Sequence, residues 1–267
     1  MLGKLIKYDF KYGCRIFAIL HIMFLGACLL GRLLYLDKID FQAPANVLVS
    51  TLSIFISVFT LLFSAVSFGV AALLAVRFYK NLFTDEGYLT WTLPATHVQQ
   101  LWAKIISGSA WYMLNITIAA AGILILLTGP NVKEAYAMVA PEVTDMLGMP
   151  LSTAAVYLLV FSLFSTISSV IMIYASIAIG QLFPGHKVLC SIITYFILYA
   201  IIQIILVFVM LALNLFPGGE MYAPNSSRAV GDYLFSTFKL SGIVFFFSTI
   251  LLYLATHYIT GRKLNLN

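Results

Sequence analysis

Six long apolar stretches constrain what this chain can fold into. They lie at about residues 15–35, 47–76, 101–127, 154–183, 188–215 and 241–260. An α-helix rises 1.5 Å per residue, so about 20 apolar residues cross a hydrocarbon core of roughly 30 Å. Membrane strands would instead show alternating segments of about ten residues, a pattern the sequence lacks. The sequence therefore predicts an all-α polytopic membrane protein with six transmembrane helices, in a single domain over 1–267.

Composition supports a lipid environment. Of the 267 residues, 62% are hydrophobic and 9% are charged, and the mean hydropathy is +1.01. Soluble domains carry roughly 45–50% apolar and about 25% charged residues. Membrane lipid is the partner that this composition requires.

The charged residues predict the orientation of the spans. One set of connections comprises the N-terminus, the segments 77–104 and 184–188 and the C-terminal tail. It holds ten of the 15 Lys and Arg residues and three of the 10 acidic residues. By the positive-inside rule this set is cytoplasmic, so both termini are cytoplasmic. Because topology accounts for the net charge of +5, we expect no nucleic-acid partner.

Residues 1–14 read as an amphipathic helix. Apolar and basic residues take opposite sides of it: Leu2, Leu5, Ile6 and Phe10 against Lys4, Lys7 and Lys11. The pattern suits an interfacial helix in the headgroup layer. A basic tail that only enforces orientation is the alternative.

Motifs for chemistry within the chain are missing. The sequence has no GxxxxGK[ST], HExxH or GxSxG motif. Cys14, Cys28 and Cys190 lack metal-ligand spacing, so we expect no metal and no enzyme activity. His21 and His257 are the intramembrane ionisable candidates, and for both we expect a hydrogen-bonded packing role. We find no polar residue pair at mid-bilayer.

Small residues form stripes in two spans. The stripes are Ser53, Ser57, Thr60, Ser64 and Ser67 in the second span, and Ser162, Ser165 and Ser169 in the fourth. Such residues let membrane helices approach closely and bond across an interface. The alternative interpretation is that a stripe lines a translocation path.

The connector between the second and third spans carries the most informative local signals. Thr96 and Gln99 form a capping-box pattern, which predicts that the third helix starts just after Thr96. Asp85 and Glu86 after Thr84 predict the first turn of a short cytoplasmic helix, because acids are favoured at a helix N-terminus. The segment is more apolar than a solvated loop requires, which indicates either an amphipathic loop that rests on the membrane or a docking site for a partner.

This connector resembles that of the short six-span permeases of bacterial ABC-2 type transporters. The matching residues are Phe78-Tyr79-Lys80-Asn81-Leu82-Phe83, Thr84-Asp85-Glu86-Gly87-Tyr88-Leu89-Thr90 and Thr92-Leu93-Pro94. The segment from Leu2 to Phe10 and the tail Arg262-Lys263-Leu264-Asn265-Leu266 are also similar to the family's ends.

The resemblance implies a permease subunit of an ATP-driven exporter in the bacterial cytoplasmic membrane. It implies a partner dimer of cytoplasmic ABC ATPases, which bind the ATP and Mg²⁺, and a second permease copy or paralogue. The cargo would be an amphipathic peptide or a hydrophobic small molecule. The short connector helix would be a coupling helix that contacts the ATPase through Phe83, Thr84, Asp85, Glu86, Tyr88, Leu89 and Leu93.

Two other classes remain open on the sequence. A secondary transporter or channel would need a polar pair at mid-bilayer. A membrane-bound enzyme, or a non-transporting sensor or immunity subunit, would need a cluster of His, Asp or Glu at one interface.

Overall fold

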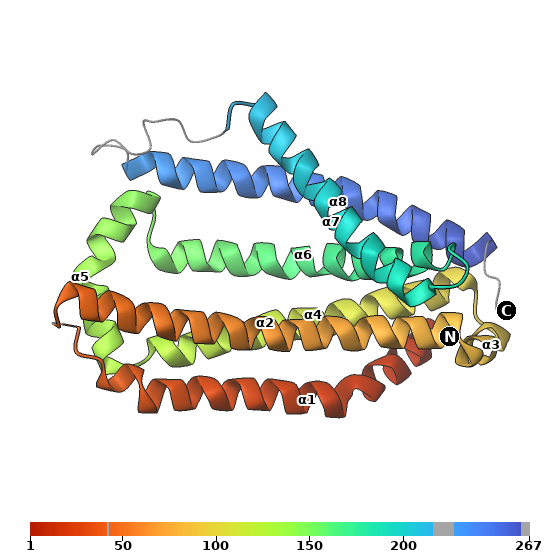
Figure 1. Ribbon diagram of the computed structural model, residues 1–267, viewed down its shortest axis with the longest axis horizontal. Coiled ribbons are helices and arrows are strands. Elements are labelled where there is room, and N and C mark those ends of the chain that lie inside the picture. The colour runs from red at the N-terminus through yellow and green to blue at the C-terminus, as the bar shows by residue number, and fades with distance from the viewer. Residues whose placement is uncertain (42, 216–226, 263–267) are drawn as a thin grey trace.

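The protein is a bundle of long helices that lie side by side (Figure 1). The computed structural model describes residues 1–41, 43–215 and 227–262. In chain order the helices are α1 Leu2–Leu34, η1 Leu36–Lys38, α2 Ala45–Phe83, α3 Asp85–Thr92, α4 His97–Leu127, α5 Pro130–Leu147, α6 Leu151–Gly180, α7 Lys187–Ala212 and α8 Ser227–Arg262. Within these described ranges, six helices are long and apolar enough to cross a membrane. The prediction of an all-α polytopic membrane protein is confirmed.

Helix α1 joins two elements that the sequence suggested were separate. The amphipathic stretch 1–14 and the first span form one α-helix, Leu2–Leu34, which bends near its N-terminal end (Figure 1). The N-terminal turns pack a face against α4, where Phe10 stacks on Trp111 with ring centroids 4.3 Å apart. The amphipathic pattern is real, and its apolar side contacts protein.

Helix α5 lies between the predicted third and fourth spans, in an interval where the sequence predicted no helix. Pro130 occupies the first turn, and Gly148 ends the helix with a left-handed φ of 67°. Both are standard boundary signals. Within Pro130–Leu147, all of which is described, no residue is buried. Helix α5 therefore lies across one end of the bundle and joins its two halves (Figure 1).

The last span is also longer than expected. Helix α8 begins at Ser227, whereas the sixth span was predicted to begin at about residue 241. The predicted loop over 216–226 and the tail over 263–267 fall outside the described residues.

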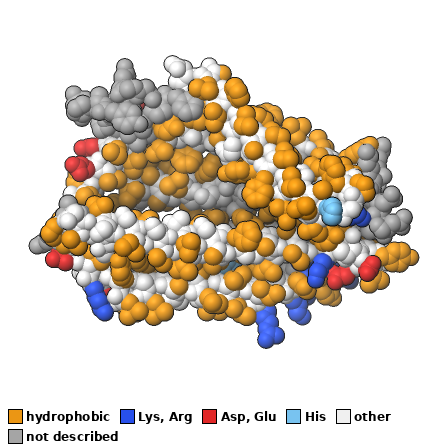
Figure 2. All heavy atoms as spheres, in the orientation of Figure 1, with side chains coloured by type: hydrophobic (Ala, Val, Ile, Leu, Met, Phe, Trp, Pro, Cys, Tyr) orange, Lys and Arg blue, Asp and Glu red, His pale blue; other side chains and the backbone are white. Residues whose placement is uncertain are grey.

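The two ends of the bundle differ in packing. No residue of α6 is buried over 151–165, whereas from Val170 to Gly180 nearly all of its residues are buried. At the packed end Gly108 of α4 lets α6 approach. A Cβ at Gly108 would lie 2.5 Å from Tyr174 Oη and 3.1 Å from Val170 Cγ1. Figure 2 shows the open half as a hollow between α2 and α8. The bundle is thus closed at the end that carries α3 and open towards α5.

Candidate functional site

The connector residues form a short helix at the closed end of the bundle. Helix α3 spans Asp85–Thr92 and lies at the same end of the bundle as the N-terminus of the chain (Figure 1). Thr96 and Gln99 form a complete capping box, and α4 starts at His97. Both local predictions, a short helix after Thr84 and a helix start after Thr96, are confirmed.

Contacts to α2 and α4 fix the position of α3. Gly87 is buried, and a Cβ there would lie 2.8 Å from the carbonyl carbon and oxygen of Leu82. The Trp91 indole donates to the Leu82 carbonyl at 3.3 Å. Gln100 of α4 donates to the Thr90 carbonyl at 2.8 Å. Helix α3 is therefore held by the close approach of Gly87 to Leu82 and, at its C-terminal end, by hydrogen bonds to α2 and α4.

The outward face of α3 is apolar and acidic. Tyr88 and Leu89 are 67% and 69% exposed, and Leu93 is 46% exposed. Asp85 and Glu86 are exposed in the first turn. We call these five residues the α3 face. They stand together on a helix that extends beyond the closed end of the bundle, which is the arrangement that a docking surface needs.

Two of the seven predicted contact residues lie further inward. Phe83 is half-buried, and its ring lies 5.9 Å from that of Phe78 and 6.4 Å from that of Tyr79. The Thr84 hydroxyl donates to the Lys80 carbonyl at 2.6 Å. Phe83 and Thr84 therefore shape the junction between α2 and α3, and they present less surface to a partner than the α3 face does.

Beneath α3 lies a cluster of charged residues that we call the ion cluster. Asp9 of α1 is 8% exposed. Its Oδ1 accepts from Arg77 Nη2 of α2 at 2.7 Å and from Lys104 Nζ of α4 at 2.6 Å. Charge pairs interact more strongly away from water, so this carboxylate joins three helices at one point.

Asn81 extends the ion cluster to α3. With its amide in the orientation that satisfies its neighbours, Asn81 Oδ1 accepts from Lys104 Nζ at 2.7 Å. Its Nδ2 donates to Glu86 Oε2 at 3.1 Å. With Asp9 and Arg77, the cluster then contains two cations and two carboxylates, so its formal charge balances. A continuous path of polar contacts connects the N-terminal helix with the first turn of α3.

A pair of histidines links α3 to the last helix. The His97 ring stacks on Trp91 of α3 with centroids 5.1 Å apart and an interplanar angle of 8°. His257 of α8 meets His97 edge to face, also at 5.1 Å. Across the described part of the chain, no group of three or more His, Cys, Asp or Glu could hold a metal ion. The two histidines join α3, α4 and α8 by ring packing, and the hydrogen-bonded role expected for the His257 side chain stays a prediction.

A polar network in the middle of the bundle corrects one expectation. His21 Nε2 lies 3.2 Å from Asn115 Oδ1, and Asn115 Nδ2 donates to Ser67 Oγ at 3.1 Å. These residues fall in the middle thirds of α1, α4 and α2. This polar pair could not be predicted from the sequence, because His21 and Asn115 are 94 residues apart and Asn115 gave no local signal. His21 and Asn115 are 3% and 2% exposed, so the network is enclosed and joins three helices.

The two small-residue stripes have different surroundings. Ser53, Ser57, Thr60 and Ser64 of α2 are exposed, and towards the closed end Ser67 is half-buried. Figure 2 shows pale, non-hydrophobic surface over α2 along the edge of the hollow. The exposed part of this stripe is therefore not used for packing within the described chain.

In α6 the serine hydroxyls of the stripe donate hydrogen bonds to backbone carbonyls of the same helix. Ser165 donates to the Ser162 carbonyl at 2.8 Å, and Ser169 donates to the Ser165 carbonyl at 3.1 Å. The residues are half-buried. The hydroxyl that crosses to α8 is instead that of Ser168, which lies 2.5 Å from Thr249 Oγ1.

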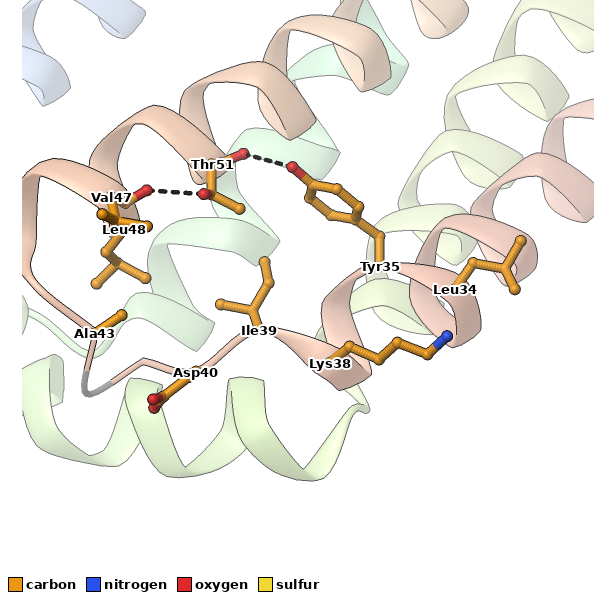
Figure 3. Close-up of a pocket in the computed structure, with 9 residues that line it drawn as sticks. All are labelled: Leu34, Tyr35, Lys38, Ile39, Asp40, Ala43, Val47, Leu48 and Thr51. Carbon is orange, nitrogen blue, oxygen red and sulfur yellow. Dashed lines mark hydrogen bonds between the residues drawn. The ribbon is translucent and has the colours of Figure 1, made fainter.

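A crevice of about 310 Å³ lies at the far end, between the end of α1 and the start of α2. Tyr35 donates across it to the Thr51 carbonyl at 3.3 Å. Figure 3 shows that the charged ends of Lys38 and Asp40 point away from the centre of the crevice. The Ile39 side chain points towards the centre. Since charged groups do not converge here, the crevice offers no arrangement for catalysis.

Comparison with known proteins adds no assignment. No protein family, no curated protein and no solved structure matches the chain.

Proposed function

We propose that the chain is the permease subunit of an ATP-driven exporter of the ABC-2 type in the bacterial cytoplasmic membrane. Its ends would be cytoplasmic, and a separate dimer of ABC ATPases would bind ATP and Mg²⁺. A second permease copy or paralogue would complete the transporter. The cargo would be an amphipathic peptide or a hydrophobic small molecule.

The α3 face is the observation that carries this proposal. Three apolar side chains, Tyr88, Leu89 and Leu93, are exposed beside two carboxylates on a helix that is bonded to α2 and α4. A surface that must pass on a partner's motion has to be exposed to that partner and firmly connected to the spans. The α3 face meets both requirements.

The open half of the bundle is consistent with a passage for cargo. The hollow between α2 and α8 (Figure 2) has pale, non-hydrophobic surface along one edge and hydrophobic side chains within it, and this half of α2 carries exposed hydroxyls. Mixed hydroxyl and apolar walls suit an amphipathic cargo better than a bare ion, since ion sites need converging oxygens or charges.

A secondary transporter is a second candidate, and the His21 network favours it. An ionisable residue in the middle of a membrane bundle is a functional-site candidate by default. Against this, His21 is 3% exposed. A coupling residue has to exchange protons or ions with water, so an enclosed histidine fits a packing role better.

Site-specific photo-crosslinking tests the proposal. Tyr88 is replaced by p-benzoylphenylalanine in cells that contain the native protein's partners, and Leu124, which is 62% exposed on the far half of α4, serves as the control position. We expect irradiation to join position 88, but not position 124, to a soluble protein that contains GxxxxGK[ST].

The cross-linked ATPase is then purified and combined with the chain in nanodiscs. Wild-type chain should stimulate ATP hydrolysis, and Asp85→Lys with Tyr88→Ala should abolish the stimulation without lowering the melting temperature. Full stimulation by the double variant would show that the α3 face is not the contact. Transport that continues without ATP, follows a proton gradient and is lost in His21→Gln would replace the proposal with a secondary transporter.

A further inference from the structure

The basic side of the N-terminal helix forms a second surface, distinct from the α3 face. Lys4, Lys7, Lys11 and Arg15 are all exposed. Their spacings of three, four and four residues place them within about 80° of one another on a helix. We propose that this basic stripe binds the headgroups of anionic phospholipids. The proposal does not depend on the function assigned above.

The opposite side of the same turns faces the protein. Asp9, Gly13 and Phe17 are buried, and Phe17 packs on Trp111 with centroids 4.5 Å apart. These contacts fix the rotation of α1 about its axis. The cations are therefore held away from the bundle.

Carboxylates do not neutralise the stripe. Asp9, the acidic residue in this segment, is turned inward and paired with Arg77 and Lys104. Over the described ranges, no carboxylate lies within ion-pair distance of the four stripe cations. Four like charges on one exposed face thus leave a strong local positive potential, which a layer of anionic headgroups complements.

The position of the stripe along α1 matches the headgroup layer. Between Arg15 and Arg32 the helix rises about 25 Å, close to the roughly 30 Å hydrocarbon core. Arg32 marks the far boundary, where it donates to Thr128 Oγ1 at 2.7 Å. Arg15 then lies near the other boundary. Lys11 lies about 6 Å further along the helix, in the headgroup layer, and Lys7 and Lys4 lie about 12 and 16 Å further, on the bent end of α1 (Figure 1).

Exposed tyrosines accompany the cations. Tyr8 and Tyr12 are 69% and 64% exposed and adjoin the stripe. The Arg77 guanidinium lies 3.8 Å above the Tyr12 ring, which holds that side chain at this level. Tyrosine is enriched at the boundary between hydrocarbon and water. A soluble acidic protein could bind a basic stripe at any distance from the membrane. This stripe begins at the hydrocarbon boundary, so the geometry favours the lipid surface as its partner.

Native mass spectrometry of the purified full-length chain tests the proposal. The protein is released from micelles that contain equal amounts of phosphatidylglycerol and phosphatidylcholine, and the bound lipids are counted. The test variant is Lys4→Gln, Lys7→Gln, Lys11→Gln. The control removes three exposed lysines outside the stripe, Lys38→Gln, Lys133→Gln, Lys239→Gln.

We expect wild-type and control proteins to retain phosphatidylglycerol over phosphatidylcholine and the test variant to lose that preference. A cation near an anionic surface contributes about fivefold in affinity, so three exchanges should reduce the preference at least tenfold. Equal retention of both lipids by wild type would overturn the proposal. A preference that survives in the test variant, or falls equally in the control, would also overturn it. A thermal melt of each variant confirms that the fold is intact.

Discussion

Removing the Asp9 carboxylate should destabilise the closed end of the bundle. Arg77 and Lys104 both contact Asp9 Oδ1, at 2.7 and 2.6 Å, so their charged nitrogens lie no more than about 5 Å apart. In Asp9→Ala these two cations lose their shared counter-charge. At an effective dielectric constant of 20 their mutual repulsion is about 3 kcal/mol. Breaking a buried pair by removing one partner typically costs about 3–5 kcal/mol, so we expect a loss in that range.

A thiol-reactive dye measures this loss in detergent. Cys28 is buried in α1, so it reacts only when the protein unfolds. Cys14 and Cys190 are exchanged for serine in all proteins compared. A loss of 3–5 kcal/mol corresponds to a fall in melting temperature of about 6–20 °C for a chain of this size. Asp145→Ala, at an exposed position of α5, is the control and should shift the midpoint by at most about 2 °C.

A second substitution distinguishes repulsion between Arg77 and Lys104 from a general loss of packing at the closed end. Adding Lys104→Met to Asp9→Ala removes one of the two cations, and the remaining Arg77 keeps its contact with the Tyr12 ring. We therefore expect the double variant to melt at a higher temperature than Asp9→Ala alone. The charge-balance argument for the ion cluster is wrong if the falls in melting temperature caused by Asp9→Ala and Lys104→Met add in the double variant. It is also wrong if Asp9→Ala melts at the same temperature as wild type.

Two further substitutions test the polar network around His21 and the packing of α3 on Leu82. Asn115→Leu leaves His21 Nε2 without its buried partner. It should lower the free energy of unfolding by about 1–3 kcal/mol, measured in the same thermal assay, and an unchanged midpoint would contradict the network. Gly87→Ala places a Cβ 2.8 Å from the Leu82 carbonyl, so it should cost about 1–3 kcal/mol and reduce cross-linking from position 88. Gly26→Ala, where nothing lies within 4 Å, should change neither measurement.

Local signals in the sequence predicted the elements that depend on local physics. Long apolar runs set the number of spans, because lipid leaves a chain few ways to satisfy its backbone. Thr96 and Gln99 fixed the start of α4 through a capping box that depends on four consecutive residues. The acids at Asp85 and Glu86 marked the start of α3 in the same way.

Helix α5 was missed although its boundary signals were present. Pro130 and Gly148 stand at its two ends, but the charges at Lys133 and Glu134 made the segment read as a polar loop. An exposed helix across the end of a bundle lacks the buried stripe that hydropathy detects. Its proline and glycine were the residues that could have identified it.

The ion cluster could not be read from sequence because its partners are far apart. Asp9 pairs with residues 68 and 95 positions away. Among three lysines, a single aspartate reads as part of a solvated surface. Likewise, the serines of α2 and α6 share a spacing, but tertiary packing exposes the first set and half-buries the second. Spacing defines the face of a helix, whereas the packing partner decides what that face meets.

Helix α2 connects the features on which the proposals depend. Its half towards the open end carries exposed hydroxyls, Ser67 joins the central network, Arg77 and Asn81 belong to the ion cluster, and Leu82 supports α3. All lie on one uninterrupted helix, Ala45–Phe83, whose backbone hydrogen bonds resist bending in the absence of proline. A displacement of α3 that leaves its contacts to Leu82 intact must therefore move α2 as a rod. We expect such a displacement to change the width of the hollow between α2 and α8 rather than to dissipate within the connector.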